Sequence, residues 1–217
     1  MWWQFLVCAL GGYLLGSVPV GLIVGRVARG IDIRQYGSGK TGATNVLRTV
    51  GARWGAVALA GDLAKGAVPV LIARLLSDDP YVQTVAGLGA AFGHDWPVFA
   101  GFQGGRGVAT SFAAALAMSP IPAAALLPVG VGLVAYTRIM SVMSVGMAPV
   151  LAIVFVVLAA VGFHSWAYAA YAVIAAALVI VLHRENIERL IAGTEPRLGA
   201  VGSRRERAAP AESPAGE

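Results

Sequence analysis

Residues 32–48, called the first loop below, gather the backbone and side-chain groups that proteins use to bind phosphate. Glycines at positions 37, 39 and 42 permit positive φ angles, so that successive N–H groups can turn toward one point. Hydroxyl and amide side chains add hydrogen-bond donors, and basic side chains add charge. The sequence therefore predicts a phosphate site in this loop, formed by Gly37, Ser38, Gly39, Lys40, Gly42, Thr44 and Asn45, with Arg48 following.

Two nucleotide-binding motifs match the first loop in spacing only. Gly37, Gly39 and Gly42 have the spacing of the dinucleotide fingerprint, but no strand is expected before them and the chain has no βαβ pattern. The Gly-Lys-Thr sequence at 39–41 imitates a P-loop, yet Arg34 stands where that motif begins with glycine. We reject both nucleotide interpretations.

Residues 93–110, the second loop, repeat this chemistry. A Gly-Gly-Arg-Gly sequence directly precedes an apolar helical segment, so that helix N-terminal N–H groups and a guanidinium can converge on an anion. Two anion-binding loops indicate two phosphorylated ligands. His94 is more typical of a structural turn here than of a catalyst. The predicted second anion site comprises Gly104, Gly105, Arg106 and Gly107.

Two other polar pairs leave their roles open. Asp62 and Lys65 lie one helical turn apart inside an apolar segment, where charges are costly, so we expect a mutual ion pair facing a polar interior. Structural and functional roles are equally compatible with that pair. His183 and Asn186 share a helix face, and they either present an imidazole and an amide to one ligand or simply end a helix.

The composition places these loops on a membrane protein. Of the 217 residues, 58% are hydrophobic and 12% are charged, about half the charged fraction of a soluble domain. At about 20 apolar residues per crossing the length allows about five to seven spans, and we expect about seven. The expected fold is an all-α, polytopic integral membrane helix bundle, a single domain at residues 1–202. Its apolar segments are 3–25, 53–77, 81–93, 107–118, 121–137, 142–161 and 164–183.

The basic residues predict the orientation of this bundle. Lys and Arg near helix ends stay on the cytoplasmic side, and an N-terminus outside places nearly all of them there. The net charge of +5 is then explained by topology and needs no nucleic acid as partner. The polar segments expected on the cytoplasmic face are 29–52, 94–106, 138–141 and everything after 183. Residues 203–217 are expected to be a disordered polar cytoplasmic tail.

Taken together, these segments resemble the bacterial acyl-phosphate:glycerol-3-phosphate acyltransferase family, the PlsY type. The motifs occur in order over nearly the whole chain. They are Gly16-Ser17-Val18-Pro19, Gly37-Ser38-Gly39 with Thr44-Asn45, Gly104 to Thr110, and His183-Arg184-Glu185-Asn186-Ile187 with Gly193-Thr194-Glu195-Pro196.

The resemblance implies an enzyme of the inner (plasma) membrane whose active site faces the cytoplasm. It would transfer a fatty acyl group from acyl phosphate to the 1-hydroxyl of glycerol 3-phosphate, giving lysophosphatidic acid and phosphate, with a functional link to an enzyme that produces acyl phosphate. It carries acyl-phosphate contacts onto the first loop. Lys40 stands where the family usually has Asn, and Arg106 stands where it usually has Lys. The change at position 106 keeps the charge but replaces a compact ammonium with a planar guanidinium that can bind in a bidentate way. The resemblance carries glycerol 3-phosphate contacts onto the five residues expected to be catalytic, Ser38, Arg48, Arg106, His183 and Asn186.

The expected mechanism is direct attack by the glycerol hydroxyl on the acyl carbonyl, with neither a cofactor nor a metal. Cys8 lies in an apolar run and is not placed as a nucleophile. Ser38 and the loop N–H groups would hold phosphate while Arg48 and Arg106 neutralise charge. The proton goes to His183 or to a substrate phosphate; the resemblance favours the phosphate, which leaves His183 to bind and orient. Two other classes remain as alternatives, a transporter for an anionic metabolite and a metal-dependent lipid-headgroup enzyme.

Overall fold

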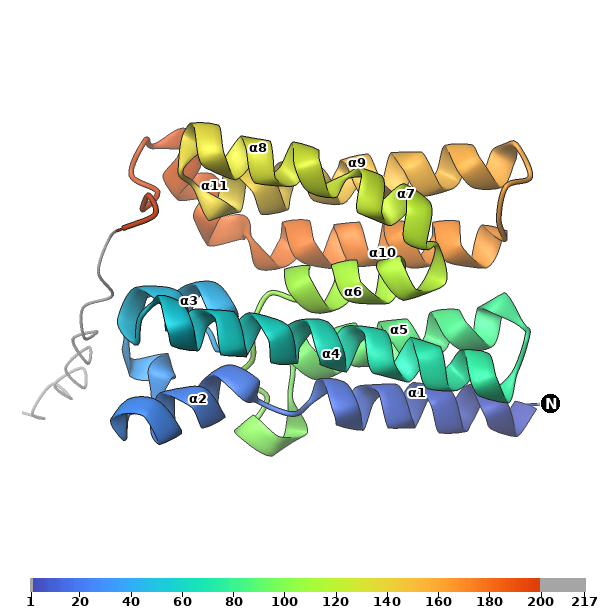
Figure 1. Cartoon of the computed structure of the whole chain (residues 1–217), viewed down its shortest axis with the longest axis horizontal. Helices are drawn as coiled ribbons and strands as arrows, with labels where there is room; N and C mark the ends of the chain where they lie inside the picture. The colour runs from blue at the N-terminus through green and yellow to red at the C-terminus, as the bar shows by residue number, and fades with distance from the viewer. Residues whose placement is uncertain (1, 200–217) are drawn as a thin grey trace, which may run out of the picture.

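The computed structural model describes residues 2–199, and within that range the regular structure is helical (Figure 1). Two 3-10 turns, η1 (Ile33–Gln35) and η2 (Val98–Ala100), interrupt the loops. The α-helices are α1 (Trp2–Gly16), α2 (Val20–Arg29), α3 (Ala43–Thr49), α4 (Ala52–Leu76), α5 (Pro80–Asp95), α6 (Val108–Met118), α7 (Pro120–Ala125), α8 (Leu127–Thr137), α9 (Met140–Ala160), α10 (Trp166–Leu182) and α11 (Arg184–Ile191).

Each of the seven apolar segments is helical, which confirms the predicted all-α fold. Within residues 2–199, four helical segments are long and apolar enough to cross a membrane, and α10 with α11 makes a fifth if that pair, bent by 60°, is one span. Helices α5 and α6 have 16 and 11 residues, fewer than the ~20 of a straight crossing. Seven crossings and the orientation of the termini therefore stay predictions. The four segments are Trp2–Arg29, Ala52–Leu76, Pro120–Thr137 and Met140–Ala160.

The first apolar segment, 3–25, is broken into two helices, a break that the sequence analysis did not predict. Helix α1 ends at Gly16 and α2 begins at Val20, because Pro19 has no N–H to donate and its ring disrupts the preceding turn. The break exposes the Val18 carbonyl in the interior, where Lys65 Nζ donates to it at 3.0 Å. The same carbonyl also accepts from the N–H of Val20 at 2.9 Å, so the side chain of α4 adds a second hydrogen bond at the break between α1 and α2.

Small residues let α1 and α5 lie against each other. A Cβ added at Gly12 or Gly16 would be 2.2 Å from the carbonyl oxygen of Ala86 or Ala90, respectively, and one at Gly93 would be 2.2 Å from that of Tyr13. Only glycine permits this approach, as in other helix pairs in membranes. The tight pair forms one side of the bundle and places the end of α5, which leads into the second loop, beside the break in the first segment.

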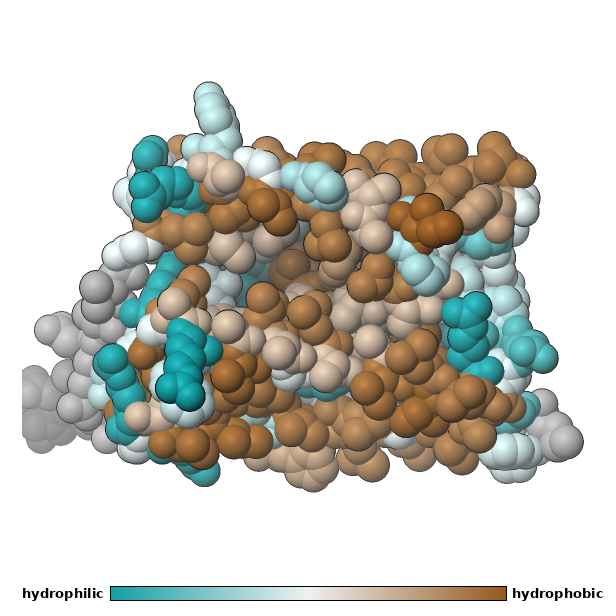
Figure 2. Space-filling view, in the orientation of Figure 1, coloured by the Kyte–Doolittle hydropathy of each residue, from teal (hydrophilic) through white to brown (hydrophobic). Residues whose placement is uncertain are grey.

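The helices form two layers with α6 between them (Figure 1). Helices α1 to α5 make one layer and α7 to α11 the other, and Phe155 and Tyr171 are fully buried in the core between α6, α9 and α10. Hydrophobic side chains cover the middle of the visible face, and hydrophilic ones gather near its two ends (Figure 2). Helices α2, α3 and α11 lie at the same end of the bundle (Figure 1). The predicted tail, 203–217, lies outside the described residues.

Candidate active site

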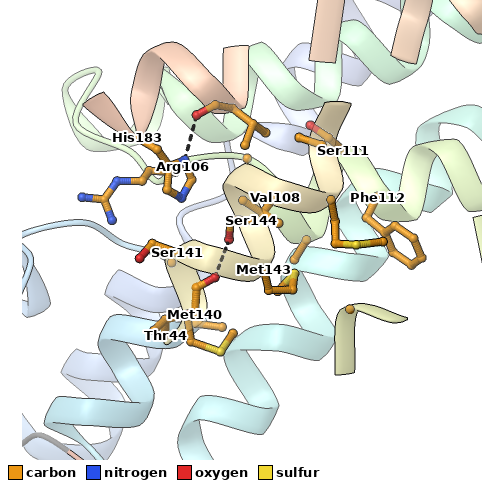
Figure 3. A pocket seen from close by; sticks show the side chains of 18 of the residues that line it. Thr44, Arg106, Val108, Ser111, Phe112, Met140, Ser141, Met143, Ser144 and His183 are labelled. Carbon is orange, nitrogen blue, oxygen red and sulfur yellow. Dashed lines mark hydrogen bonds between the residues drawn. The ribbon is translucent and has the colours of Figure 1, made fainter. Parts of the chain in front are cut away.

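A cavity of about 710 Å³ lies between the two layers and has two chemically different ends. Its polar end is lined by parts of both loops and by α11, while its apolar end is lined by side chains of α4, α6, α8, α9 and α10. In the space-filling view the face is hollowed between α8 and α4 (Figure 2). Arg106 and His183 lie at one side of the pocket, with Met143 and Phe112 at another (Figure 3).

The structure brings most of the predicted site residues to this one cavity. Its lining includes all five residues expected to be catalytic: Ser38, Arg48, Arg106, His183 and Asn186. It also includes Lys40, Gly42, Thr44, Asn45 and Gly107. Four glycines of the predicted sites are not among the lining residues: Gly37, Gly39, Gly104 and Gly105.

The side chain of Asn45 organises the first loop. Its Nδ2 lies 3.1, 3.1 and 2.9 Å from the carbonyl oxygens of Ile33, Tyr36 and Lys40, and its Oδ1 accepts from the N–H of Ser38 at 3.1 Å. Asn45 sits in the first turn of α3, so one buried amide ties the loop to a helix. This network holds Ser38 and Lys40 at the cavity.

The glycines and N–H groups of the first loop behave only partly as expected. Gly37 and Gly39 have positive φ angles of 53° and 70°, as predicted, whereas Gly42 has a φ of −71°. The N–H of Gly39 donates to Tyr36 and that of Thr41 to the Gly104 carbonyl. Like the N–H of Ser38, these groups are engaged within the protein instead of converging on a ligand. Side chains must therefore supply much of the phosphate contact.

In the second loop, glycine provides space. A Cβ at Gly105 would be 1.9 Å from His94 Nε2, and one at Gly104 would be 2.1 Å from the His94 carbonyl oxygen. Gly107 begins α6 with a φ of 67° and would place a Cβ 2.9 Å from the Asp95 carboxylate. The loop is thus folded directly onto the end of α5. Arg106 projects from it into the cavity, with its Nε donating to the Leu182 carbonyl at 3.1 Å.

A buried ionic network lies beside the second loop, among α4, α5 and α6. Asp62 and Lys65 form the predicted pair, with 3.1 Å between Oδ1 and Nζ, and His94 Nδ1 lies 3.5 Å from the same carboxylate oxygen. The Thr110 hydroxyl donates to the Asp62 carbonyl, so it accepts from His94 Nδ1 at 3.2 Å. Helices α4, α5 and α6 therefore meet at His94, whose Nδ1 has a partner on each of the two neighbouring helices.

Cations dominate the electrostatics of the polar end. Burial lowers the pKa of Arg48 and of Arg106, and nearby arginines lower each further, Arg189 for both and Arg48 for Arg106. Arginine stays protonated in proteins, so the cost appears as unfavourable electrostatic free energy in the empty site. A bound dianion would relieve that cost. Arg48 Nε is buried and has no hydrogen-bond partner among residues 2–199.

The comparisons with known proteins agree on one family. A family profile described as glycerol-3-phosphate acyltransferase matches residues 6–193. The chain belongs to this family. A glycerol-3-phosphate acyltransferase of Synechococcus sp. (strain CC9902) is 46% identical over 199 residues, covering 92% of this chain and 97% of that protein. One of Geobacter sulfurreducens is 45% identical over 196 residues, covering 90% of this chain and 98% of that protein.

Solved structures of the family have the same fold. The crystal structure of PlsY (YgiH), an integral membrane glycerol 3-phosphate acyltransferase, in its glycerol 3-phosphate form is 37% identical with a TM-score of 0.82, covering 90% of this chain and 96% of that one. The lysophosphatidic acid form of PlsY gives a TM-score of 0.80 at 36% identity. This acyltransferase is accordingly an integral membrane protein.

Sequence reasoning left Glu195 out of the acyltransferase site. Its carboxylate accepts hydrogen bonds from Ser141 at 2.8 Å, Asn186 at 2.6 Å and Arg189 at 2.8 Å. Burial raises the pKa of Glu195, but these hydrogen bonds outweigh burial and leave it lowered overall. Glu195 therefore joins α9 to α11 and orients Asn186. The motif Gly-Thr-Glu-Pro was the available signal, but a role for its carboxylate appears only when the segments come together.

Proposed function

We propose that this chain transfers a fatty acyl group from acyl phosphate to the 1-hydroxyl of glycerol 3-phosphate, giving lysophosphatidic acid and inorganic phosphate. Acyl transfer to glycerol 3-phosphate follows from the family, and acyl phosphate is the donor we infer. The observation that carries the proposal is the continuity of the cavity, which joins two partly buried arginines to an apolar channel between helices. A donor with a phosphate at one end and an acyl chain at the other fits that shape.

The cationic end is suited to both phosphates. Arg48 and Arg106 offer guanidinium groups, and Lys40, Ser38 and Thr44 line the same end of the cavity. Guanidinium groups bind phosphate oxygens bidentately and remain charged. They would also stabilise the charge that develops on the carbonyl oxygen and on the leaving phosphate. We assign the donor phosphate to the first loop and place Arg48 and Arg106 between the two substrates.

His183 and Asn186 can bind the hydroxyl groups of the acceptor. His183 Nδ1 lies 2.7 Å from the Val179 carbonyl (dashed in Figure 3), which only accepts, so in the neutral ring Nε2 is the acceptor. Asn186 donates to Glu195, while its buried Oδ1 has no partner among residues 2–199. Two acceptors thus suit the two hydroxyls of glycerol 3-phosphate.

The reaction then needs no covalent enzyme intermediate. The 1-hydroxyl oxygen attacks the carbonyl carbon, a new ester C–O bond forms, and the C–O bond to phosphate breaks. The hydroxyl proton goes to a substrate phosphate oxygen and leaves with inorganic phosphate, while His183 holds and orients the alcohol. Orientation of two bound reactants supplies a large part of such a rate enhancement.

The deciding experiment incubates purified protein with palmitoyl phosphate and glycerol 3-phosphate, with and without a metal chelator. We expect phosphate release that requires both substrates, equals lysophosphatidic acid formed and is indifferent to chelator. Palmitoyl-CoA in place of palmitoyl phosphate should give no product. No turnover together with uptake of glycerol 3-phosphate into vesicles would instead identify a transporter, and loss of activity with chelator would favour a metal-dependent enzyme.

His183→Gln separates binding from base catalysis. A rise in the glycerol 3-phosphate KM that is independent of pH supports an orienting role, since glutamine can still accept a hydrogen bond. A large fall in kcat with an altered pH profile would instead assign proton transfer to His183.

We also propose that residues 1–202 form a single domain that crosses the inner (plasma) membrane seven times. In this topology the N-terminus is outside, and the C-terminus and the active site are on the cytoplasmic side. An enzyme that produces acyl phosphate would supply the donor. The clustering of arginines at the polar end of the cavity supports this orientation. Cysteine labelling tests it, starting from a Cys8→Ala background. A membrane-impermeant thiol reagent applied to intact cells should modify an Asp78→Cys variant and spare Arg138→Cys; the reverse pattern would invert the topology.

A further inference from the structure

Helix α8 contributes a wall to the apolar end of the cavity but is packed lightly against the rest of the protein. Its lining residues recur at helical spacing, and Gly130 is the buried residue of this helix. The opposite face, which includes Tyr136, is exposed. The α8 residues in the lining are Leu127, Gly130, Val131, Val134 and Ala135.

Gly130 faces a stripe of methionines on α9. A Cβ built at Gly130 would lie 3.5 Å from Met143 Cγ, 3.8 Å from Met147 Cγ and 3.9 Å from Met143 Sδ, all ordinary contact distances. Any larger side chain at position 130 must therefore displace the methionines or extend into the channel. Met140, Met143 and Met147 all line the cavity and follow one another on the same face of α9.

The position of Gly130 along α8 sets which part of a ligand it meets. It precedes Thr137, at the polar end of this helix, by seven residues, which corresponds to about 10 Å at the ~1.5 Å rise per residue. An extended acyl chain advances roughly 1.3 Å per methylene, the projection of a C–C bond of ~1.5 Å. An acyl chain that enters from the polar end therefore reaches Gly130 after about eight carbons.

We propose that Gly130, with Met143 and Met147, determines which acyl chains the enzyme accepts, by keeping the channel wide beyond about the eighth carbon. This inference rests on the proposed acyl-phosphate activity. Methionine suits such a wall because its unbranched thioether side chain adapts to irregular shapes. The missing side chain at position 130 leaves room for those methionines to move. The site thus accepts long fatty acyl groups, including those widened by a branch or a cis double bond.

The experiment compares kcat/KM for octanoyl phosphate and palmitoyl phosphate in Gly130→Leu, at saturating glycerol 3-phosphate. We expect the palmitoyl to octanoyl ratio to fall about tenfold or more, since a methylene-sized misfit in an apolar pocket is worth at least that much. The matched control is Gly132→Leu on the same helix. Gly132 is exposed with no atom within 4 Å of an added Cβ, so it should keep the wild-type ratio.

A compensating variant distinguishes selection from a general packing defect. Met147→Ala in the Gly130→Leu background removes the side chain that the leucine displaces, and it should restore much of the palmitoyl ratio. If Gly130→Leu does not fold, Gly130→Val provides the same test, because its side chain extends beyond the Cβ that fits. We expect the palmitoyl to octanoyl ratio of this variant to lie between the Gly132→Leu value and a tenfold loss.

Two results would overturn the proposal. An unchanged ratio in Gly130→Leu would mean that the acyl chain leaves the cavity before it reaches Gly130. Equal losses for both donors without rescue by Met147→Ala would mean a packing defect only. Failure of the proposed function is distinguishable, because the wild-type protein would then turn over neither acyl phosphate.

Discussion

The two glycine-rich loops have similar compositions but use their glycines for different physical reasons. In the first loop, Gly37 and Gly39 adopt positive φ angles, and Asn45 holds the resulting turns through backbone hydrogen bonds. In the second loop, Gly104 and Gly105 are required because the chain lies directly on His94. The first loop is therefore shaped by directional bonds and the second by close contact.

This difference teaches that a glycine-rich segment need not present its backbone to a ligand. Both loops do reach the cavity, but through side chains: Ser38 and Lys40 from the first and Arg106 from the second. The two loops also hold each other, since the Thr41 N–H donates to the Gly104 carbonyl and Arg34 donates to the Ala100 carbonyl. Four experiments test how each loop is held in place and what its side chains contribute.

The largest effect is expected from Gly105→Ala. The added Cβ would be 1.9 Å from His94 Nε2, and His94 is held by Asp62 and Thr110, so we expect a loss of more than about 4 kcal/mol and little folded protein. The measurement is the yield of monodisperse protein in detergent and its unfolding midpoint. Gly42→Ala is the matched control, because Gly42 has an ordinary φ and open space around an added Cβ. Equal stability of the two variants would refute the proposed close packing.

Arg106→Gln should abolish most activity while leaving the fold intact. Removing one charged donor aimed at developing charge costs about 10²–10³ in kcat/KM. Arg106→Lys keeps the charge but loses the planar fork and the bond to Leu182, so we expect about a tenfold loss. Steady-state kinetics in both substrates checks this. If Arg106→Gln is as active as Arg106→Lys, then Arg106 does not bind the anion, and the role of the second loop is purely structural.

Asn45→Asp tests the hydrogen-bonded loop with nearly no change in shape. The carboxylate still accepts from Ser38, but an oxygen now faces the carbonyls of Ile33, Tyr36 and Lys40. We expect a loss of about 3 kcal/mol in unfolding free energy, because buried acceptors lose their donor, and a raised KM for acyl phosphate. Denaturant unfolding and kinetics measure the two effects. A wild-type KM would show that the loop keeps its form without this amide.

The smallest effect concerns pH and the segment after α11, which contacts the first loop through the Arg48 to Pro196 hydrogen bond. The pKa of Glu195 is lowered in the folded protein, so its carboxylate contributes stability above the unfolded pKa of about 4.3, and that contribution is lost as pH falls through the folded value. The unfolding midpoint of the wild type should therefore drop in this acid range. The unfolding midpoint of Glu195→Gln should be lower than that of the wild type at pH 7, and it should fall less in acid. If the midpoints of the two proteins fall equally with pH, Glu195 does not have this role.

The sequence alone determined the class of protein and the chemistry of its loops. Long apolar runs, few charges and one-sided basic residues are local properties, so they predict membrane helices without knowledge of how the helices pack. The composition of the two loops likewise indicated phosphate ligands. The break at Pro19 was missed although proline was visible, because the apolar run continues through it.

Only the tertiary structure decided which groups face the cavity. Arg48 bonds to Pro196, Arg106 to Leu182 and Ser141 to Glu195 across 148, 76 and 54 residues, and such partners depend on helix packing that no local pattern encodes. The same packing decides that Gly105 rests on His94 and that Gly130 opens toward α9. Residue types therefore specify what chemistry is available, while long-range contacts specify where that chemistry takes place.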